Sequence, residues 1–186
     1  MADKSEFDST VLPHIDSVFR GALAVSRDRQ MAEDLTQTTI LKALERFGSF
    51  REGSNCKAWL LRIMRNTWID ILRHRKVVGP QISVEEQLLA EDEEPDLTAW
   101  SDARDLIENF SDEEVINALL ELPEDQRLTL YLSDVEQLKH EEVGEIMDIA
   151  VGTVKSRTSR ARSELKKKLM DHAKDLGLAG ERMSDE

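Results

Sequence analysis

The feature that most constrains the fold is the stretch from Val151 to Lys168, which reads VGTVKSRTSRARSELKKK. Val154, Ala161 and Leu165 recur at intervals of seven and four residues, which places them on one side of an α-helix. The stretch carries seven basic side chains against a single acidic one, Glu164, although the whole chain has a formal net charge of −13. We therefore expect a helix with one packed side and one basic side that contacts a polyanion.

The residues just before this stretch predict a second, shorter helix. In HEEVGEIMDIA, the apolar residues Val143, Ile146 and Met147 have helical spacing, and residues 148–152 would form a tight connection. A helix, a turn and a basic helix make the helix-turn-helix arrangement, in which the second helix enters the major groove. We expect DNA contacts from the side chains that face away from the packed side: Lys155, Ser156, Ser159 and Arg160.

Composition favours an all-helical protein. The 186 residues are 34% charged and only 5% aromatic, and the periodic segments are rich in Leu, Ala, Glu, Lys and Arg, with no convincing strand. No apolar stretch approaches the roughly 20 residues of a membrane span, and the N-terminus lacks signal-peptide order, which predicts a cytoplasmic protein without membrane insertion. Cys56 is the only cysteine and the four histidines lack ligand spacing, so we expect no internal disulfide and no metal site. The sequence also shows no clustered nucleophile and base and no phosphate-cradling glycine loop, so we expect no catalytic residue and no cofactor.

Charge is distributed in blocks along the chain. Residues 51–76 carry seven basic side chains against two acidic ones, whereas residues 77–136 carry eighteen acidic side chains against Arg104 and Arg127. The chain then turns basic again over residues 137–170. Two basic blocks on either side of an acidic one predict two surfaces for nucleic acid, so the overall acidity does not argue against DNA binding.

The apolar spacing predicts a first helical domain over residues 1–76. We expect helices over 7–24, 31–47 and 58–76, with Pro13 tolerated only in a first turn and a polar loop over 49–57. That loop could hold an unstacked base or serve as a simple connection. In the third helix Arg62, Asn66 and Arg73 share a side with Trp59 nearby, which suits single-stranded nucleic acid. An amphipathic core helix with packed tryptophans explains the same pattern.

The rest of the chain predicts a linker, a second domain and a tail. Residues 77–110 are acidic with few periodic apolar residues and are expected to form a flexible linker. Residues 111–170 predict a four-helix unit, which opens with a capping box from Ser111 to Glu114 and has Pro123 at the first position of its second helix. Residues 171–186 are expected to be a frayed tail.

Four segments, in this order, resemble the extracytoplasmic-function (ECF) sigma factors of bacteria: AEDLTQTTILKALERF, FREGSNCKAWLLRIMRNTWIDILRHRK, LPEDQR and EEVGEIMDIAVGTVKSR. The resemblance covers about residues 7–76 and 111–169. It implies a two-domain promoter-specificity subunit of RNA polymerase that acts in a stress response. The first domain would bind the polymerase clamp and melt the minus-10 element, and the second would read the minus-35 duplex.

The resemblance also assigns roles to residues of this chain. It implies that core polymerase is bound by Asp34, Gln37 and Leu41, two of which would otherwise be read as part of a solvated helix face. It implies minus-10 DNA binding by Arg51, Ser54, Asn55, Lys57, Trp59, Arg62, Asn66 and Arg73. It implies minus-35 DNA binding by Thr153, Lys155, Ser156, Arg157, Ser159 and Arg160. Within the basic helix, Arg157 and Arg162 are expected to contact phosphates or nearby acids.

Four positions depart from the family pattern. Thr38 stands where an acidic residue is usual, beside the residues expected to bind polymerase. Gln137 and Lys139 replace a glycine and a small capping residue that are usual before the third helix of the second domain, which predicts a less tightly capped turn. Thr158 stands where Leu or Ile is usual.

The partners implied are the clamp of the largest polymerase subunit, the flap of the second-largest subunit, promoter DNA and an anti-sigma protein, with a monomer when free. FREGSNCKAWL and EIMDIAVGTVKSR most resemble the subgroup controlled by zinc-binding anti-sigma proteins that respond to thiol oxidation. Two rival hypotheses are a stand-alone helix-turn-helix regulator, which leaves residues 30–76 unexplained, and a sigma mimic that sequesters an anti-sigma protein. No clustered nucleophile and base supports an enzyme.

Overall fold

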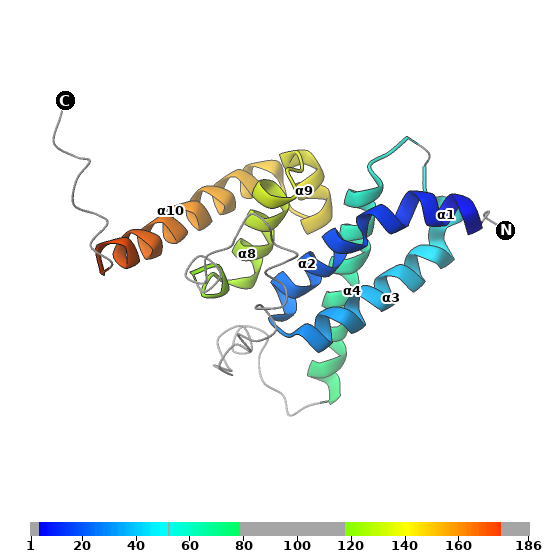
Figure 1. Ribbon diagram of the computed structural model, residues 1–186, viewed down its shortest axis with the longest axis horizontal. Helices are drawn as coiled ribbons and strands as arrows, with labels where there is room; N and C mark the ends of the chain where they lie inside the picture. The colour runs from blue at the N-terminus through cyan, green and yellow to red at the C-terminus, as the bar shows by residue number, and fades with distance from the viewer. Residues whose placement is uncertain (1–3, 52, 79–117, 176–186) are drawn as a thin grey trace.

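The computed structural model describes residues 4–51, 53–78 and 118–175, and the regular elements in these ranges are all helical (Figure 1). This confirms the expected all-α fold for the described part of the chain. The elements form two helical units: the first holds α1 to α4 and the second holds α8 to α10. None of the helices in the described ranges has the length and apolar character needed to cross a membrane.

The start of the chain differs from the prediction of one helix over residues 7–24. The structure has α1 over Lys4–Val11, a 3₁₀ turn over Leu12–His14 and α2 over Ile15–Ser26. Pro13 lies in the turn, where its missing N–H and its ring prevent the preceding helix from continuing. Val11 and Val18 on either side of the break are nevertheless fully buried, so the apolar pattern was correct although the continuous helix was wrong.

The next two predicted helices of the first unit are confirmed. Helix α3 spans Arg29–Arg46 and is followed by a 3₁₀ turn over Phe47–Ser49, and helix α4 spans Cys56–Val78. Asp28 caps α3, because its side chain accepts a hydrogen bond of 2.5 Å from the Met31 N–H. On α4, Leu60 and Met64 lie on one side of the helix and are fully inaccessible.

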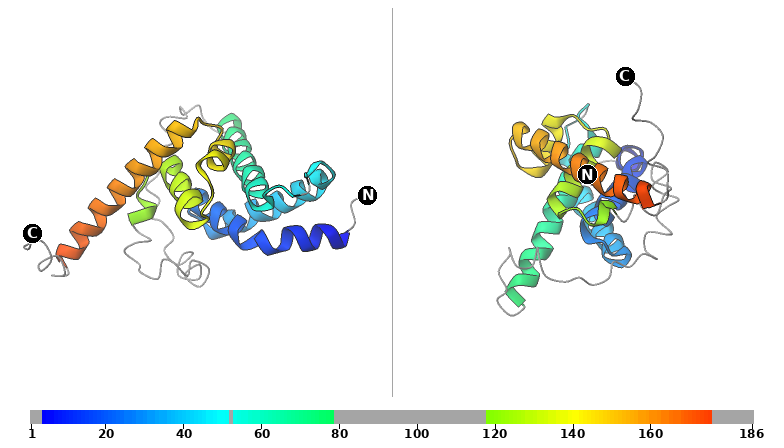
Figure 2. Two further views of the ribbon diagram at one scale, coloured as in Figure 1. Left: turned by 90° about the horizontal axis from the view of Figure 1, so that it is seen from above. Right: turned by 90° about the vertical axis from the view of Figure 1, so that its left-hand side faces the viewer.

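The second unit contains α8 over Glu124–Leu130, α9 over His140–Met147 and α10 over Val151–Asp175. A π-helical turn over Tyr131–Val135 follows α8 directly. Pro123 is the N-cap of α8 rather than its first helical residue. Helix α10 continues to Asp175, past the predicted start of the tail at residue 171, and extends away from the rest of the molecule (Figure 2).

The helix-turn-helix between α9 and α10 depends on one close approach. Asp148 ends α9 in a left-handed conformation (φ 51°), and the Ile149 N–H donates to the Gly144 carbonyl at 3.0 Å. A Cβ built on Gly144 would lie 2.9 Å from the Ile149 carbonyl oxygen, so only glycine fits there without movement of the turn. The predicted tight connection is therefore present.

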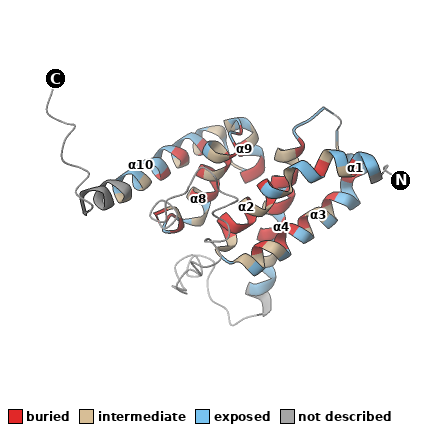
Figure 3. Ribbon diagram, in the orientation of Figure 1, coloured by how far each residue is buried: buried red, intermediate tan, exposed pale blue. Residues whose placement is uncertain are grey.

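The two units share one apolar core, which Figure 3 shows as buried residues where the helices meet. Leu60 and Met64 of the first unit belong to the same cluster as several side chains of the second: Leu120, Leu128, Leu132, Val143, Ile146, Met147 and Val154. A smaller cluster of Leu122, Leu130 and Ala161 joins α8 to α10. Helices α2 and α4 pack against α8 and α9, so the second unit lies directly on the first.

Several sequence-based expectations fall outside the described residues. They are the body of the acidic linker predicted over 77–110, the capping box from Ser111 to Glu114 and the last part of the predicted tail.

Candidate polymerase and nucleic-acid interfaces

One side of α3 is exposed and carries the three residues expected to bind polymerase. Asp34 and Gln37 are exposed, and the side chain of Leu41 is 61% exposed, which is unusual for a leucine in a packed helix. Leu35 and Thr39, on the opposite side of the same helix, are fully buried. The structure therefore places the three predicted residues together on a free surface that mixes polar and apolar groups.

The loop before α4 is shaped by hydrogen bonds within it and by one contact from the second unit. The Ser54 hydroxyl donates to the Arg51 carbonyl at 2.6 Å, and Gly53 has a positive φ of 80°. Asn55 caps α4, because its side-chain oxygen accepts from the Ala58 N–H at 3.2 Å. The side-chain nitrogen of Asn55 donates to Glu142 at 2.7 Å, so both ends of this amide are engaged.

Lys57 points toward a buried carboxylate of the second unit. Its Nζ lies 2.9 Å from Glu136 Oε2 and donates to the Glu136 carbonyl at 2.9 Å. Burial opposes the negative charge of Glu136, but hydrogen bonds from Tyr131, Lys57 and Ser17, together with the charge of Lys57, outweigh it and lower the pKa of the carboxyl. The residue predicted to bind DNA thus holds an internal ion pair in this structure.

The outward side of α4 is free. Arg62, Asn66 and Arg73 are exposed, and Arg73 Nη1 lies 3.9 Å from Asp70 Oδ1. The tryptophans behave differently from these polar residues. Trp59 is half-buried with its ring 5.0 Å from that of Phe50, and Trp68 is buried. The helix therefore combines the two patterns expected from the sequence: its tryptophans pack against the core, and Arg62 and Arg73 are exposed.

The basic face of α10 divides into free and paired residues. Lys155, Ser156, Ser159 and Arg160 are exposed, while Thr153 is half-buried. Arg160 donates to Ser156 on its own helix, at 3.3 Å to both the carbonyl and the hydroxyl.

The two other arginines of this helix are held by acids of the second unit. Arg157 pairs with Asp125 at 3.0 Å, and Arg162 donates to both carboxylate oxygens of Asp134 at 2.9 and 2.6 Å. The expectation that these arginines contact nearby acids is confirmed.

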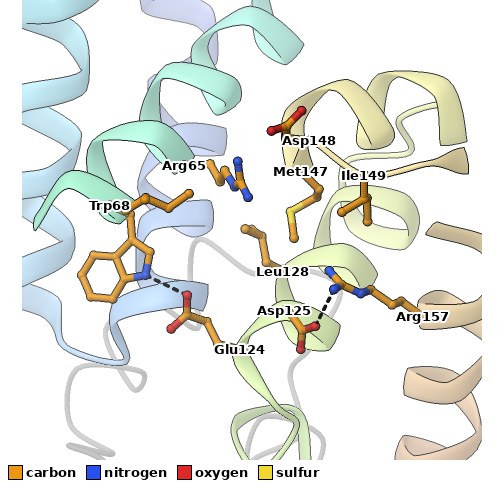
Figure 4. Close-up of a pocket in the computed structure, with 10 residues that line it drawn as sticks. Arg65, Trp68, Glu124, Asp125, Leu128, Met147, Asp148, Ile149 and Arg157 are labelled. Carbon is orange, nitrogen blue, oxygen red and sulfur yellow. Dashed lines mark hydrogen bonds and ion pairs between the residues drawn. The ribbon is translucent and has the colours of Figure 1, made fainter. Parts of the chain in front are cut away.

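A pocket of about 250 Å³ lies where the two units meet (Figure 4). Its apolar lining includes Trp68 and Leu128, and the Trp68 indole N–H donates to Glu124 at 2.8 Å. Burial raises the pKa of the Glu124 carboxyl even though the Trp68 hydrogen bond acts in the opposite direction. Burial likewise lowers the pKa of Arg65, whose guanidinium lines the same pocket.

Three residues that sequence reasoning missed join the two units. Arg127 is buried, donates to the carbonyls of Ala24, Leu120 and Leu122, and has its pKa lowered to about 10 by burial. Glu136 and Glu142 hold Lys57 and Asn55. No local signal identified these roles, because the partners lie far away along the chain. Within the described residues no group of three or more His, Cys, Asp or Glu side chains is placed to hold a metal ion.

The departures from the family pattern have visible consequences in the structure. Gln137 has a φ of 54°, in the left-handed region that favours glycine, and Lys139 is the N-cap of α9 without a side-chain cap. The N-cap position therefore lacks the side-chain acceptor of a small capping residue, although Glu142 accepts from the Lys139 N–H. Thr158 is buried and lies 3.4 Å from the Ser133 hydroxyl.

Comparison with known proteins accounts for both units. A sequence profile of sigma-70 region 2 matches residues 10–77, and one of sigma-70 region 4 matches residues 112–165. The ECF RNA polymerase sigma factor EcfG of Rhodopseudomonas palustris is 36% identical over 170 residues, covering 90% of this chain and 87% of that protein. This chain belongs to the ECF sigma factors. The RNA polymerase sigma-H factor of Pseudomonas aeruginosa is 31% identical over 90% of this chain and 88% of its own length.

Two solved structures share the fold of this sigma factor. The sigma factor RpoE of Bartonella quintana, crystallised with the anti-sigma factor NepR, superposes with a TM-score of 0.66 at 28% identity, covering 89% of this chain and 97% of its own. CnrH in complex with the cytosolic domain of CnrY superposes with a TM-score of 0.62 at 19% identity, over 90% of both chains.

As an ECF sigma factor, the protein is a DNA-binding subunit that directs RNA polymerase to promoters for transcription initiation. Sigma factors are regulatory subunits rather than enzymes. The region 2 match also accounts for residues 30–76, which the hypothesis of a stand-alone helix-turn-helix regulator left unexplained.

Proposed function

We propose that the two helical units divide the work of initiation, with the exposed side of α3 docking on polymerase. Asp34, Gln37 and Leu41 lie on one free surface, and the apolar exposure of Leu41 is the observation that carries the assignment. An exposed apolar side chain rimmed by polar groups is typical of a protein-binding surface. Its partner would be the clamp of the largest polymerase subunit.

The outward side of α4 and the loop before it would engage the minus-10 strand. Arg62, Asn66 and Arg73 are exposed along one side of α4 and can follow a phosphate backbone. Arg51, Ser54, Asn55, Lys57 and Trp59 would complete this surface from the loop and the first turns of the helix. Flipping a base out of the duplex costs roughly a few kcal/mol of stacking free energy, so the loop must offer the flipped base replacement contacts.

The free residues of α10 would read the minus-35 duplex. Lys155, Ser156, Ser159 and Arg160 present donors that can reach base edges or phosphates in the major groove. Thr153 lies one turn before Ser156 on the same helix and would join this surface. Arg157 was also assigned to DNA by resemblance, but its ion pair with Asp125 favours a role in positioning the helix. The flap of the second-largest polymerase subunit would hold this second unit near the duplex.

An anti-sigma protein is the proposed regulator. The Bartonella quintana structure pairs a similar sigma factor with the anti-sigma factor NepR, and that relationship supports an anti-sigma partner here. The finer subgroup, controlled by a zinc-binding partner that senses thiol oxidation, requires a reactive thiol. Cys56 is buried and burial raises the pKa of its thiol, so the sensing thiol would belong to the partner. The site of action would be the cytoplasm, with a monomer before polymerase binds.

Binding measurements on two variants test this division of labour. Asp34→Ala combined with Gln37→Ala should weaken binding to purified core polymerase by about tenfold or more. Arg160→Ala should leave that affinity unchanged. If the double substitution lowers DNA recognition while polymerase affinity stays the same, the assignment of α3 is wrong. Retention of anti-sigma binding with no core binding by the wild-type chain would instead favour the sigma mimic.

A further inference from the structure

The second unit occupies hydrogen-bonding groups of the surface assigned to minus-10 DNA. Glu142 of α9 accepts from the Asn55 side chain at 2.7 Å, and Glu136, which follows the π-helical turn, lies 2.9 Å from Lys57 Nζ. Asn55 and Lys57 flank the start of α4, so the two acidic residues approach one short stretch of the first unit. We name Glu136 and Glu142 the acidic pair.

The contact at Glu136 is a built site rather than a surface ion pair. The Glu136 side chain is 3% exposed and receives hydrogen bonds from Ser17 at 2.9 Å and Arg20 at 3.1 Å, both on α2. Tyr131 donates to the same carboxylate, and Lys57 approaches it from α4. A buried carboxylate with this many donors is stable only while they stay in place, because loss of the partners would leave a desolvated charge.

The backbone around Glu136 positions it toward the first unit. The Glu136 N–H donates to the Tyr131 carbonyl at 3.0 Å, a π-type bond that widens the last turn of this segment. Gln137 then takes a left-handed conformation with φ 54°, and the Leu138 N–H closes the turn on the Leu132 carbonyl. Gly21 of α2 gives room for Tyr131, since a Cβ there would lie 3.3 Å from its ring.

The contact at Glu142 joins the starts of two helices. One Glu142 oxygen accepts from the Lys139 N–H at 2.9 Å at the start of α9, and the other accepts from Asn55, the cap of α4. A carboxylate near two helix N-termini is favoured by both helix dipoles.

We infer that the acidic pair is an intrachain competitor of the minus-10 strand: its carboxylates occupy Lys57 and Asn55 in the closed chain, and the two units must separate before DNA can bind there. Carboxylate oxygens offer these donors the same anionic acceptors that phosphate oxygens would. The inference rests on the minus-10 assignment made above. Polymerase would relieve the competition by holding the two units apart.

Distance measurements between the units test the closed contact. Spin labels would be placed on the full-length chain at Gln30→Cys in α3 and Ser163→Cys in α10, both exposed positions. Glu136→Gln with Glu142→Gln removes both charges while keeping side-chain size. We expect a longer-distance population to appear in this variant. The matched control is Glu141→Gln with Glu145→Gln, which removes the same charge from exposed positions of α9 and should leave the distance distribution as in the wild type.

Binding to a single-stranded oligonucleotide pool of randomised sequence supplies the second readout. We expect the acidic-pair variant to bind about tenfold more tightly than the matched control, which corrects for the general effect of lower negative charge. If Glu136→Gln impairs folding, as circular dichroism would show, Glu142→Gln alone should produce the same changes at smaller size, because Glu142 is half-buried at the edge of the contact.

An unchanged distance distribution would overturn the inference even if the minus-10 assignment is correct. If the acidic-pair variant shows the longer distance but does not bind DNA more tightly, the acidic pair does not compete with DNA. The assignment of Asn55 and Lys57 to the minus-10 strand is then the part that is wrong.

Discussion

The side-chain nitrogen of Asn55 donates a 2.7 Å hydrogen bond to Glu142, a residue 87 positions further along the chain. Asn55 also caps α4, and Glu142 also accepts from the Lys139 N–H at the start of α9. One polar contact therefore ties the first turn of a helix assigned to promoter opening to the first helix of the duplex-reading motif. The first unit is therefore connected to the second through a group that it would use on DNA.

The close approach at Gly144 predicts a substitution that damages the helix-turn-helix. Gly144→Ala should lower the free energy of unfolding by about 2 kcal/mol, because the added Cβ would lie 2.9 Å from the Ile149 carbonyl oxygen. Urea denaturation followed by circular dichroism measures the change.

Gly152→Ala is the matched control for this prediction. No atom lies within 4 Å of a Cβ built there, and the residue is in the first turn of α10, so alanine should stabilise the protein by up to about 1 kcal/mol. Equal effects of the two substitutions would show that the close approach does not constrain the turn.

Arg127 predicts a large loss of stability on replacement. Arg127→Met keeps the length of the side chain but removes the buried donor of the Ala24 and Leu122 carbonyls and leaves the Leu120 carbonyl with Arg27 as its donor. The free energy of unfolding should fall by about 3 kcal/mol. Arg162→Met breaks an exposed ion pair with Asp134 and should change the free energy of unfolding by less than about 1 kcal/mol. Similar losses in the two variants, measured by chemical denaturation, would contradict the structural role of Arg127.

The N-cap residue of α9, Lys139, has no side-chain acceptor, and this predicts a stabilising substitution. Lys139→Ser would supply an acceptor for the free N–H groups of the first turn and complete a capping box with Glu142, raising the free energy of unfolding by about 1 kcal/mol. Lys139→Ala lacks the acceptor and serves as the control in thermal unfolding. If Lys139→Ala raises the free energy of unfolding by the same amount, the gain comes from removing the lysine and not from the new cap.

The exposed position of Arg160 predicts loss of duplex recognition. Arg160→Ala should weaken binding of the polymerase holoenzyme to a minus-35 duplex by roughly 1 to 3 kcal/mol, as for a lost base contact. Arg162→Ala should have a smaller effect that is similar for every promoter, because Asp134 already holds that guanidinium. Competition binding with promoter variants separates the two patterns. An Arg160→Ala holoenzyme with wild-type preferences would refute the assignment.

Local periodicity predicted most of the helices and the solvent exposure of the site. Spacing of three and four residues marks which side of a helix packs, and it correctly placed Val154 and Ala161 in the core and Lys155 and Arg160 outside. The break at Pro13 was missed because its apolar neighbours keep helical spacing through the 3₁₀ turn.

The contacts between units could not be predicted in the same way. The Lys57 contact with Glu136 spans 79 positions and the Ser17 contact spans 119, and no local pattern encodes which distant side chain will face an acid. The π-helical turn that directs Glu136 depends on the same tertiary packing. Sequence reasoning placed Asn55 and Lys57 at a DNA surface but had no means of showing that the chain itself covers them.

Reconstitution with purified core RNA polymerase and a library of promoter fragments tests the central claim most directly. The account predicts a stable complex between the full chain and core polymerase, and transcripts that start from a defined subset of the fragments only when the chain is present. Absence of both the complex and promoter-dependent initiation would contradict it.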